Sequence, residues 1–433
     1  MSGTGLVWFR NDLRVNDNAS LLSAITENEN IIGIYFFDPR HFEVSSFGFK
    51  KTEQYRAKFL IESITELRNN LEKLNIPLFI YKQYPEDVFP QFLEDRNITN
   101  LYMQKEWTEE EVKVTNAVKK GTKRYAMQWK ESYDQFLFHP DDIPFQLKDI
   151  PDVFTNFRKK CEKFVPVRKE CTVAKVSLGN KIENNSIIPT LASLGFNEFT
   201  TDSRSAFPFT GGESQALQRI QEYFWETKKL SYYKKTRNGL MGENYSSKLS
   251  AWLANGSISP RTIYFEIKRY EQEIGANEST YWLIFELIWR DFFKYISLKH
   301  GNAIFKLTGI QNKEYLWNKD QELVKKWIYG ETNEPFVNAN MIELKYTGWM
   351  SNRGRQNVAS FFAKNQELDW RIGAAYFEAM LIDYDVHSNY GNWLYVSGVG
   401  NDPRDRKFNN RLQAQRYDPK QKFQQLWLQP TIF

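Results

Sequence analysis

The chain has 433 residues, of which 41% are hydrophobic, 16% aromatic and 26% charged. These values are typical of a soluble globular protein with two or three domains and a large core. No stretch reaches the roughly 18 apolar residues that a membrane-spanning helix needs, which excludes that class. The net charge of +5 is compatible with nucleic-acid binding if the positive side chains cluster on one surface. If they do not cluster, the net charge gives no information about the partner.

The two cysteines, Cys161 and Cys171, have no metal-type spacing and no histidine cluster beside them. They predict free thiols in a reducing compartment and no bound metal. The chain opens with a predicted strand and not with a basic segment followed by an apolar run, so no secretory signal is visible. We therefore expect a cytoplasmic protein, and we expect it to be a monomer.

The first part of the chain alternates short apolar runs with helix-like patterns. The predicted strands are Leu6–Phe9, Ile31–Phe37, Leu78–Tyr81 and Leu101–Met103, with another near Tyr125–Trp129. The predicted helices are Ala19–Glu27, Thr52–Leu74, Glu86–Asp95 and Glu109–Lys119. This alternation predicts a doubly wound parallel α/β domain over residues 1–131. No GxGxxG follows the first strand and no GxxxxGK[ST] occurs, so an ordinary dinucleotide or P-loop module is excluded.

The second part of the chain differs in composition and period. Residues 132–204 are rich in proline and asparagine and predict a long connector with a local helix near Phe154–Phe164. Residues 205–433 predict an all-helical domain. Its expected helices are Glu213–Thr227, Ser247–Asn255, Arg261–Glu273, Thr280–His300, Asp320–Tyr329, Asn338–Tyr346, Asn352–Phe362 and Arg371–Asp383.

The run Tyr281–Phe293 is the most informative segment. It is apolar and aromatic apart from Glu286, Arg290 and Asp291. On a helix Glu286 and Arg290 are spaced i,i+4 and can pair, and Trp289 lies on nearly the same face. Such a face suits a flat ligand rich in heteroatoms, but a buried helix with one internal ion pair explains the run equally well.

Three further segments carry polar groups. Tyr245–Leu253 places Ser246, Ser247, Lys248 and Ser250 at a helix start, where phosphate binds well, although an ordinary serine cap is the simpler interpretation. Trp349–Gln356 is either a basic helix start on the surface or a polar clamp.

Leu381–Trp393 places Asp383, Asp385 and Asn389 after an expected helix. Metal binding and acid–base chemistry are options for this segment, and turn chemistry that ends the helix is the simplest one.

Taken together, these segments resemble the photolyase/cryptochrome family, and within it the DASH-type cryptochromes. The resemblance rests on Val7–Asn18, Tyr233–Arg261, Asn277–Phe293, Thr347–Phe362, Leu368–Glu378 and Asp383–Trp393, in this order. It spans nearly the whole chain. It implies that the helical domain binds FAD and that the α/β domain binds an antenna chromophore, expected to be 5,10-methenyltetrahydrofolate held by Glu106.

The resemblance also implies roles for individual residues. The expected cofactor-binding residues are Tyr233, Ser246, Ser247, Lys248, Leu249, Ser250, Glu286, Arg290, Asn352, Arg355, Asp383, Asp385 and Asn389, with Arg355 paired to Asp383. The expected catalytic residues are Glu286, Trp289, Asn352, Gln356 and Tyr395. The expected electron-transfer residues are Trp317, Trp370 and Trp393. The expected DNA-binding residues are Arg353, Arg404, Arg406, Lys407 and Arg411.

The implied function is that of a deoxyribodipyrimidine photo-lyase. Photoexcited reduced flavin passes an electron to a cyclobutane pyrimidine dimer, the dimer splits, and the electron returns. The DASH group is expected to act mainly on single-stranded or locally unpaired DNA, where an unstacked base costs less to extrude. The (6-4) photolyases are disfavoured, because Trp349–Gln356 contains no histidine. The alternative is a blue-light photoreceptor that binds nucleic acid or a protein partner without significant repair.

Overall fold

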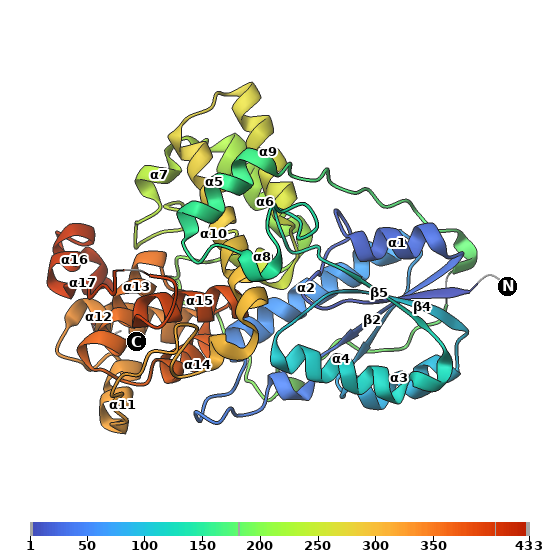
Figure 1. Cartoon of the computed structure of the whole chain (residues 1–433), viewed down its shortest axis with the longest axis horizontal. Helices are drawn as coiled ribbons and strands as arrows, with labels where there is room; N and C mark the ends of the chain where they lie inside the picture. The colour runs from blue at the N-terminus through green and yellow to red at the C-terminus, as the bar shows by residue number, and fades with distance from the viewer. Residues whose placement is uncertain (1–2, 181, 403, 430–433) are drawn as a thin grey trace.

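The computed structural model describes residues 3–180, 182–402 and 404–429. Its first part is a sheet of parallel strands in the order β3-β2-β1-β4-β5 (Figure 1). The strands are β1 (Thr4–Trp8), β2 (Asn30–Phe36), β3 (Leu78–Tyr81), β4 (Ile98–Gln104) and β5 (Gln128–Ser132). The order reverses between β1 and β4, as in doubly wound sheets. The predicted fold class, a parallel α/β part followed by a helical part, is confirmed.

Both faces of the sheet are covered by helices, so its strands are apolar on both sides. Val7 and Phe9 pack with residues of α1 and α2 on one face, whereas Leu6 and Trp8 pack with residues of α3 and α4 on the other. These helices are α1 (Ala19–Glu27), α2 (Gln54–Lys73), α3 (Pro85–Glu94) and α4 (Glu109–Gly121). Each lies within a few residues of its predicted position.

The last strand begins three residues later than the predicted segment. Residues Lys123–Tyr125 form a 3₁₀ turn, and Ala126 has a left-handed backbone with φ of 47°. This turn occupies the residues that the sequence pattern assigned to the start of the strand, so that β5 begins at Gln128.

The connector, residues 132–204, contacts both the helical part and the sheet. Its helix α5 (Phe154–Phe164) has the predicted bounds and contacts α10. The backbone N–H groups of Leu137 and Phe138 donate to the Asp291 carboxyl at 2.8–3.1 Å. Further along, the Asn180 side chain exchanges hydrogen bonds with the backbone of Ile31 in β2. The connector therefore returns from the helices to the sheet.

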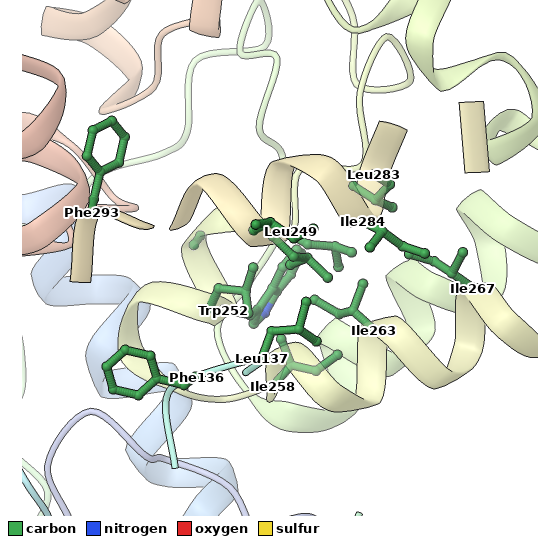
Figure 2. Close-up of a cluster of buried hydrophobic side chains, with 14 of the residues drawn as sticks. Phe136, Leu137, Leu249, Trp252, Ile258, Ile263, Ile267, Leu283, Ile284 and Phe293 are labelled. Atoms are coloured by element: carbon green, nitrogen blue, oxygen red, sulfur yellow. The ribbon is translucent and has the colours of Figure 1, made fainter. Parts of the chain in front are cut away.

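The helical part is built around α10, a 23-residue helix that starts at an Asn277 capping box. The helices are α6 (Glu213–Ile220), α7 (Tyr233–Thr236), α8 (Ser250–Asn255), α9 (Pro260–Glu273), α10 (Glu278–His300), α11 (Gln321–Tyr329), α12 (Pro335–Thr347), α13 (Asn352–Ser360), α14 (Trp370–Met380), α15 (Val386–Ser397), α16 (Asn410–Tyr417) and α17 (Lys422–Leu428). Figure 2 shows Leu249 and Trp252 in one cluster of buried side chains with Leu283 of α10 and Ile263 of α9. This core supports the segment that precedes α8.

Helix α15 differs from the sequence interpretation, which favoured a helix-ending turn. Asp385 caps α15 by accepting from the backbone N–H of Ser388 at 2.7 Å, so its turn chemistry starts a helix. Helices α16 and α17 were not predicted. Across the described ranges, we find no helix with the length and apolar character required to traverse a bilayer.

A buried charge network holds the helical part against the sheet. Arg261, at the start of α9, pairs with Asp17 and Asp134 at 2.7 and 2.6 Å. Arg14, which follows β1, pairs with Asp134 at 3.0 Å and donates to the Gly256 carbonyl at 3.0 Å. These residues are almost completely buried, and each charge has an opposite partner, as burial requires.

Candidate functional site: a polar cavity in the helical part

A cavity of about 290 Å³ lies inside the helical part. Its wall includes residues of α7, α8, α9, α10, α13, α14 and α15 and of the segment before α8. The wall includes the thirteen expected cofactor-binding residues: Tyr233, Ser246, Ser247, Lys248, Leu249, Ser250, Glu286, Arg290, Asn352, Arg355, Asp383, Asp385 and Asn389. Segments as far apart in the sequence as Tyr233 and Asn389 thus meet at one site.

The segment before α8 carries a buried cation. Lys248 has a left-handed backbone with φ of 63°, and its Nζ lies 3.3 Å from the Tyr245 ring centroid and 4.8 Å from that of Trp349. Among the described residues this Nζ has no hydrogen-bond partner. Burial lowers the pKa of Lys248 well below its usual value, against the opposing charge of Glu343. A buried amine without a partner suits an anionic ligand.

Glu286 does not pair with Arg290, although their spacing permits it. The Glu286 carboxylate instead lies 2.8 Å from Arg237, which follows α7. Arg290 donates to the carbonyls of Gln135 and Leu253 at 2.5 and 3.0 Å, so its guanidinium is directed away from Glu286. Burial raises the pKa of Glu286, and the Arg237 charge opposes that shift. The simpler explanation, a buried helix with an ion pair between its own residues Glu286 and Arg290, is therefore wrong: the cation that pairs with Glu286 lies outside α10.

The two aspartates of the Leu381–Trp393 segment are each paired with a cation. Asp383 pairs with Arg355 at 2.9 Å, as the resemblance implies, and accepts from the Ser250 hydroxyl at 2.7 Å. Asp385 pairs with Lys294 of α10 at 2.9 Å. Burial alone would raise the pKa of Asp385, but Lys294 and nearby cationic groups hold it below its usual value.

These pairings leave little reason to assign a metal to the aspartates. Within the described ranges no group of three or more His, Cys, Asp or Glu side chains could hold a metal ion. The two carboxylates fix the walls of the cavity, because each ties one helix or loop to another.

Asn352, Gln356 and Asn389 supply amide groups to the wall. Asn352 is the first residue of α13, and Gln356 lies one turn later on the same helix. The Asn389 side chain donates to the Ala374 carbonyl at 3.0 Å, which fixes its orientation. The predicted polar clamp over Trp349–Gln356 thus faces the cavity through two amides and Arg355.

Trp289 and Tyr395 do not belong to the cavity wall. Trp289 stacks on Phe154 of the connector helix with ring centroids 3.7 Å apart, and its edge-to-face contact with Tyr395 spans 6.1 Å. Both rings stay partly exposed. Helix α5 of the connector thus supplies the stacking partner of Trp289, a contact that the spacing within α10 does not reveal.

The three expected electron-transfer tryptophans differ in their exposure to solvent. Trp393 lines the cavity and is 2% exposed, Trp370 is fully buried, and Trp317 is partly exposed. An isolated bridge between Asn318 and Leu368 brings the residues beside Trp317 next to those before Trp370. Trp393 thus borders the cavity and Trp317 reaches solvent, which are the positions that the two ends of the predicted relay require.

The expected antenna and DNA residues lie outside the cavity. Glu106 follows β4 and accepts a hydrogen bond from Gln104 at 2.9 Å. Arg353 is half-buried, donates to Gln356 and Asn238 at 2.8 and 3.1 Å, and lies over the Tyr417 ring. Its guanidinium is therefore already engaged.

The other expected DNA-binding residues are more accessible. Arg404, Arg406, Lys407 and Arg411 are exposed. Arg406 lies 3.5 Å from Asp402, and Arg411 lies 3.7 Å from Glu334. Surface pairs of this kind are weak, so both side chains can be recruited by a phosphate.

Sequence reasoning missed Arg237, Lys294 and Glu343. Arg237 and Lys294 are cations that neutralise Glu286 and Asp385. Glu343 is buried on α12, and burial raises its pKa to about 8 against the charges of Lys248 and Arg355. Arg237 lies in Tyr233–Arg261, one of the segments on which the family resemblance rests. Its positive charge could have identified it there as a possible partner for a carboxylate. Nothing in the local pattern of α12 marks Glu343.

Comparison with known proteins identifies the two parts of the chain. Residues 5–174 match the DNA photolyase family description, and residues 282–431 match the FAD binding domain of DNA photolyase. The chain is 45% identical to Cryptochrome DASH of Synechocystis sp., over 98% of this chain and 87% of that protein. It is 46% identical to Cryptochrome DASH of Xenopus laevis, over 97% of this chain and 81% of that protein.

The chain belongs to the photolyase/cryptochrome family. Within it, the relatives place the chain among the DASH cryptochromes. The crystal structure of a Synechocystis cryptochrome matches with a TM-score of 0.93 and 44% identity, covering 98% of this chain and 88% of that one. A class III photolyase from Agrobacterium tumefaciens shares the fold, with a TM-score of 0.82 and 24% identity over 99% of this chain and 87% of that one.

The helical part is thus a photolyase-type FAD-binding domain, and the cavity residues fit this cofactor. Lys248 provides a buried amine without a partner, and the backbone N–H groups of Ser247, Lys248 and Leu249 have no protein acceptor among the described residues. Such groups suit a pyrophosphate. Amides and apolar side chains elsewhere in the cavity wall suit a planar ring with hydrogen-bonding edges.

Proposed function

We propose that this protein is a blue-light-dependent deoxyribodipyrimidine photo-lyase that splits cyclobutane pyrimidine dimers. Its preferred partner is DNA whose damaged bases are single-stranded or locally unpaired. The observation that carries the proposal is the shared cavity: Gln356 lines it together with the thirteen residues assigned to FAD, among which are Glu286 and Asn352. A damaged base that enters this cavity meets the cofactor site directly.

Reduced FAD, when bound, supplies an electron to the dimer under illumination and recovers it after the dimer splits. The protein contributes preorganised polar groups. Glu286 is held by Arg237 at 2.8 Å and can hydrogen-bond the imide edge of the dimer. Its raised pKa keeps a protonated, hydrogen-donating carboxyl available at higher pH than usual. Asn352 touches base and cofactor, and Gln356 borders the base.

The remaining assignments complete the proposal. Trp289 and Tyr395, partly exposed outside the cavity wall, offer ring surfaces to the extruded bases. Trp393, Trp370 and Trp317 carry electrons inward from the surface. Exposed Arg404, Arg406, Lys407 and Arg411 contact phosphates, together with Arg353 if its present partners release it. Glu106 holds a methenyltetrahydrofolate antenna.

The preference for unpaired DNA follows from the position of the site. A base must leave its stack to reach an interior cavity, and extrusion costs a few kcal/mol less where the base is already unpaired. Reduced, FAD-loaded protein should be illuminated with the same dimer in an oligothymidine, either single-stranded or annealed to its complement. We expect faster dimer loss from the single strand. Equal rates at equal occupancy would contradict the preference.

A second candidate is a photoreceptor without significant repair. The position of Trp393 on the cavity wall and the partial exposure of Trp317 favour it, because repair by already reduced flavin needs no electron relay. A light-dependent change in affinity for nucleic acid, without dimer loss, would support this function. Equal affinity in light and dark would count against it.

A further inference from the structure

Arg219 of α6 lies behind the segment that precedes α8. Its side chain is 1% exposed and does not line the cavity. The segment itself does: Tyr245, Ser246, Ser247 and Lys248 form part of the cavity wall. Arg219 therefore contacts this wall from the protein side, where no ligand reaches it.

All N–H groups of the Arg219 guanidinium are engaged. Its Nε donates to the Ser247 carbonyl at 3.1 Å, and Nη2 donates to the carbonyls of Glu243 and Ser246, both at 3.1 Å. Nη1 donates to Asn244 Oδ1 and to Glu222 Oε2, both at 2.9 Å. A guanidinium has five N–H donors in a fixed plane, so this set saturates it.

Aromatic rings restrict the guanidinium as well. Its central carbon lies 4.7 Å from the Phe209 ring centroid and 4.9 Å from that of Tyr223. A lysine in this place could keep the charge, but its three donors on a flexible stem cannot serve five acceptors in one plane. The geometry is therefore specific to arginine.

The contacts set the direction of the segment's peptide groups. Three carbonyls of residues 243–247 are turned toward Arg219, and the N–H groups of Ser247, Lys248 and Leu249 have no acceptor among the described residues. Arg219 thus binds the carbonyl oxygens, which are the negative ends of the peptide dipoles, on the side of the segment away from the cavity. The N–H groups of the segment remain free to bind an anion.

From these contacts we infer that Arg219 is a positioning residue for the phosphates of the bound cofactor. The inference rests on the proposed assignment of Ser246–Ser250 to FAD. Arg219 acts through the backbone and touches no ligand. Its effect falls on the phosphate part of the cofactor, because Arg219 holds residues 243–247, whereas Asn389 and Asn352 of the cavity wall belong to α15 and α13.

The test uses purified full-length protein with FAD removed and then added back. FAD affinity is measured by the change in flavin fluorescence, and ADP and adenosine are compared as competitors. In wild type, ADP should compete better than adenosine, because its phosphates reach the segment. Arg219→Met should weaken FAD at least about tenfold and reduce the advantage of ADP over adenosine, since several charge-assisted hydrogen bonds are lost.

Controls separate positioning from stability. Arg261→Lys alters another buried arginine in the helical part that does not contact residues 243–250. It should lower the melting temperature but leave FAD affinity within about twofold at temperatures well below melting. If Arg219→Met does not fold, Arg219→Lys and Asn244→Ala replace it, with weaker FAD binding and faster amide hydrogen exchange in residues 243–249 expected.

The outcomes are distinguishable. Wild-type FAD affinity and an unchanged ADP advantage in the Arg219 variants would overturn the inference and leave the proposed function intact. Equal losses for ADP and adenosine would also overturn it, because they indicate a general structural effect. Wild-type protein that takes up no FAD would overturn both the inference and the proposed function.

Discussion

Substitution of Gly373 by alanine tests the packing of Trp393 at the cavity. Gly373 lies on α14, and a Cβ added there would lie 2.2 Å from Cη2 of Trp393 and 2.8 Å from Cζ2 and Cζ3. Carbon atoms in contact are normally about 3.5 Å apart. Phe362 and Phe377 pack against the Trp393 ring with centroids 5.9 and 5.2 Å away, so the ring cannot simply retreat.

The direction of the stability change caused by Gly373→Ala distinguishes an open helix position from a crowded one. In an open helix position, glycine to alanine stabilises by about 0.5–1 kcal/mol. Here we expect a loss of about 1–3 kcal/mol, because the added methyl overpacks the core. We also expect weaker FAD binding, since Trp393 lines the cavity and its displacement changes the wall.

Urea unfolding of the FAD-free protein measures the stability change, and FAD titration measures the second effect. Gly121→Ala is the control, because its added Cβ would have neighbours no nearer than 3.8 Å. Trp393→Phe combined with Gly373→Ala should show a coupling of at least about 1 kcal/mol. A Gly373→Ala protein more stable than wild type, with unchanged FAD affinity, would refute the described packing.

Three further predictions concern the relay, the lesion site and the connector. Trp370→Phe should abolish photoreduction of oxidised flavin, followed by absorbance, and leave repair by chemically reduced protein intact; normal photoreduction would remove Trp370 from the relay. Glu286→Ala should lower repair yield more than FAD content, whereas parallel losses would indicate a structural role. Asp291 has a pKa raised to about 7 by burial, so the stability it contributes is present at low pH and is lost as pH rises through about 7. Relative to Asp291→Asn, wild type should therefore lose stability between about pH 4 and pH 7 in urea unfolding, by at most about 4 kcal/mol, and should lose no more above about pH 7; a constant difference would contradict the raised pKa.

Regular elements could be predicted where local signals agree. The strands β1 to β4 and the helices α1 to α4 follow from apolar periodicity, and α5 lies where a local helix was predicted in the connector. Helix α15 was missed because an aspartate such as Asp385 is typical both of a turn that ends one helix and of the cap that starts the next. Only the neighbouring α14, which ends at Met380, decides between them.

The sequence was sufficient to predict which residues line the cavity, but not which side chains pair with one another. The resemblance supplied residues that the fold brings into one cavity. The partners of Glu286 and Asp385 are Arg237 and Lys294, which lie far away in sequence and are set by tertiary packing. The stacking of Trp289 on Phe154 likewise depends on where the connector helix docks. Spacing along α10 carries no information about either contact.

The most direct test of the proposed function is light-driven repair by wild-type protein with its flavin reduced. A single-stranded oligothymidine containing one cyclobutane dimer is added in excess, and thymine absorbance is followed in light and in darkness. We predict that absorbance recovers only in light and continues through many turnovers. Protein that holds reduced FAD, binds the oligomer and restores no absorbance under blue light would contradict the assignment as a dimer photo-lyase.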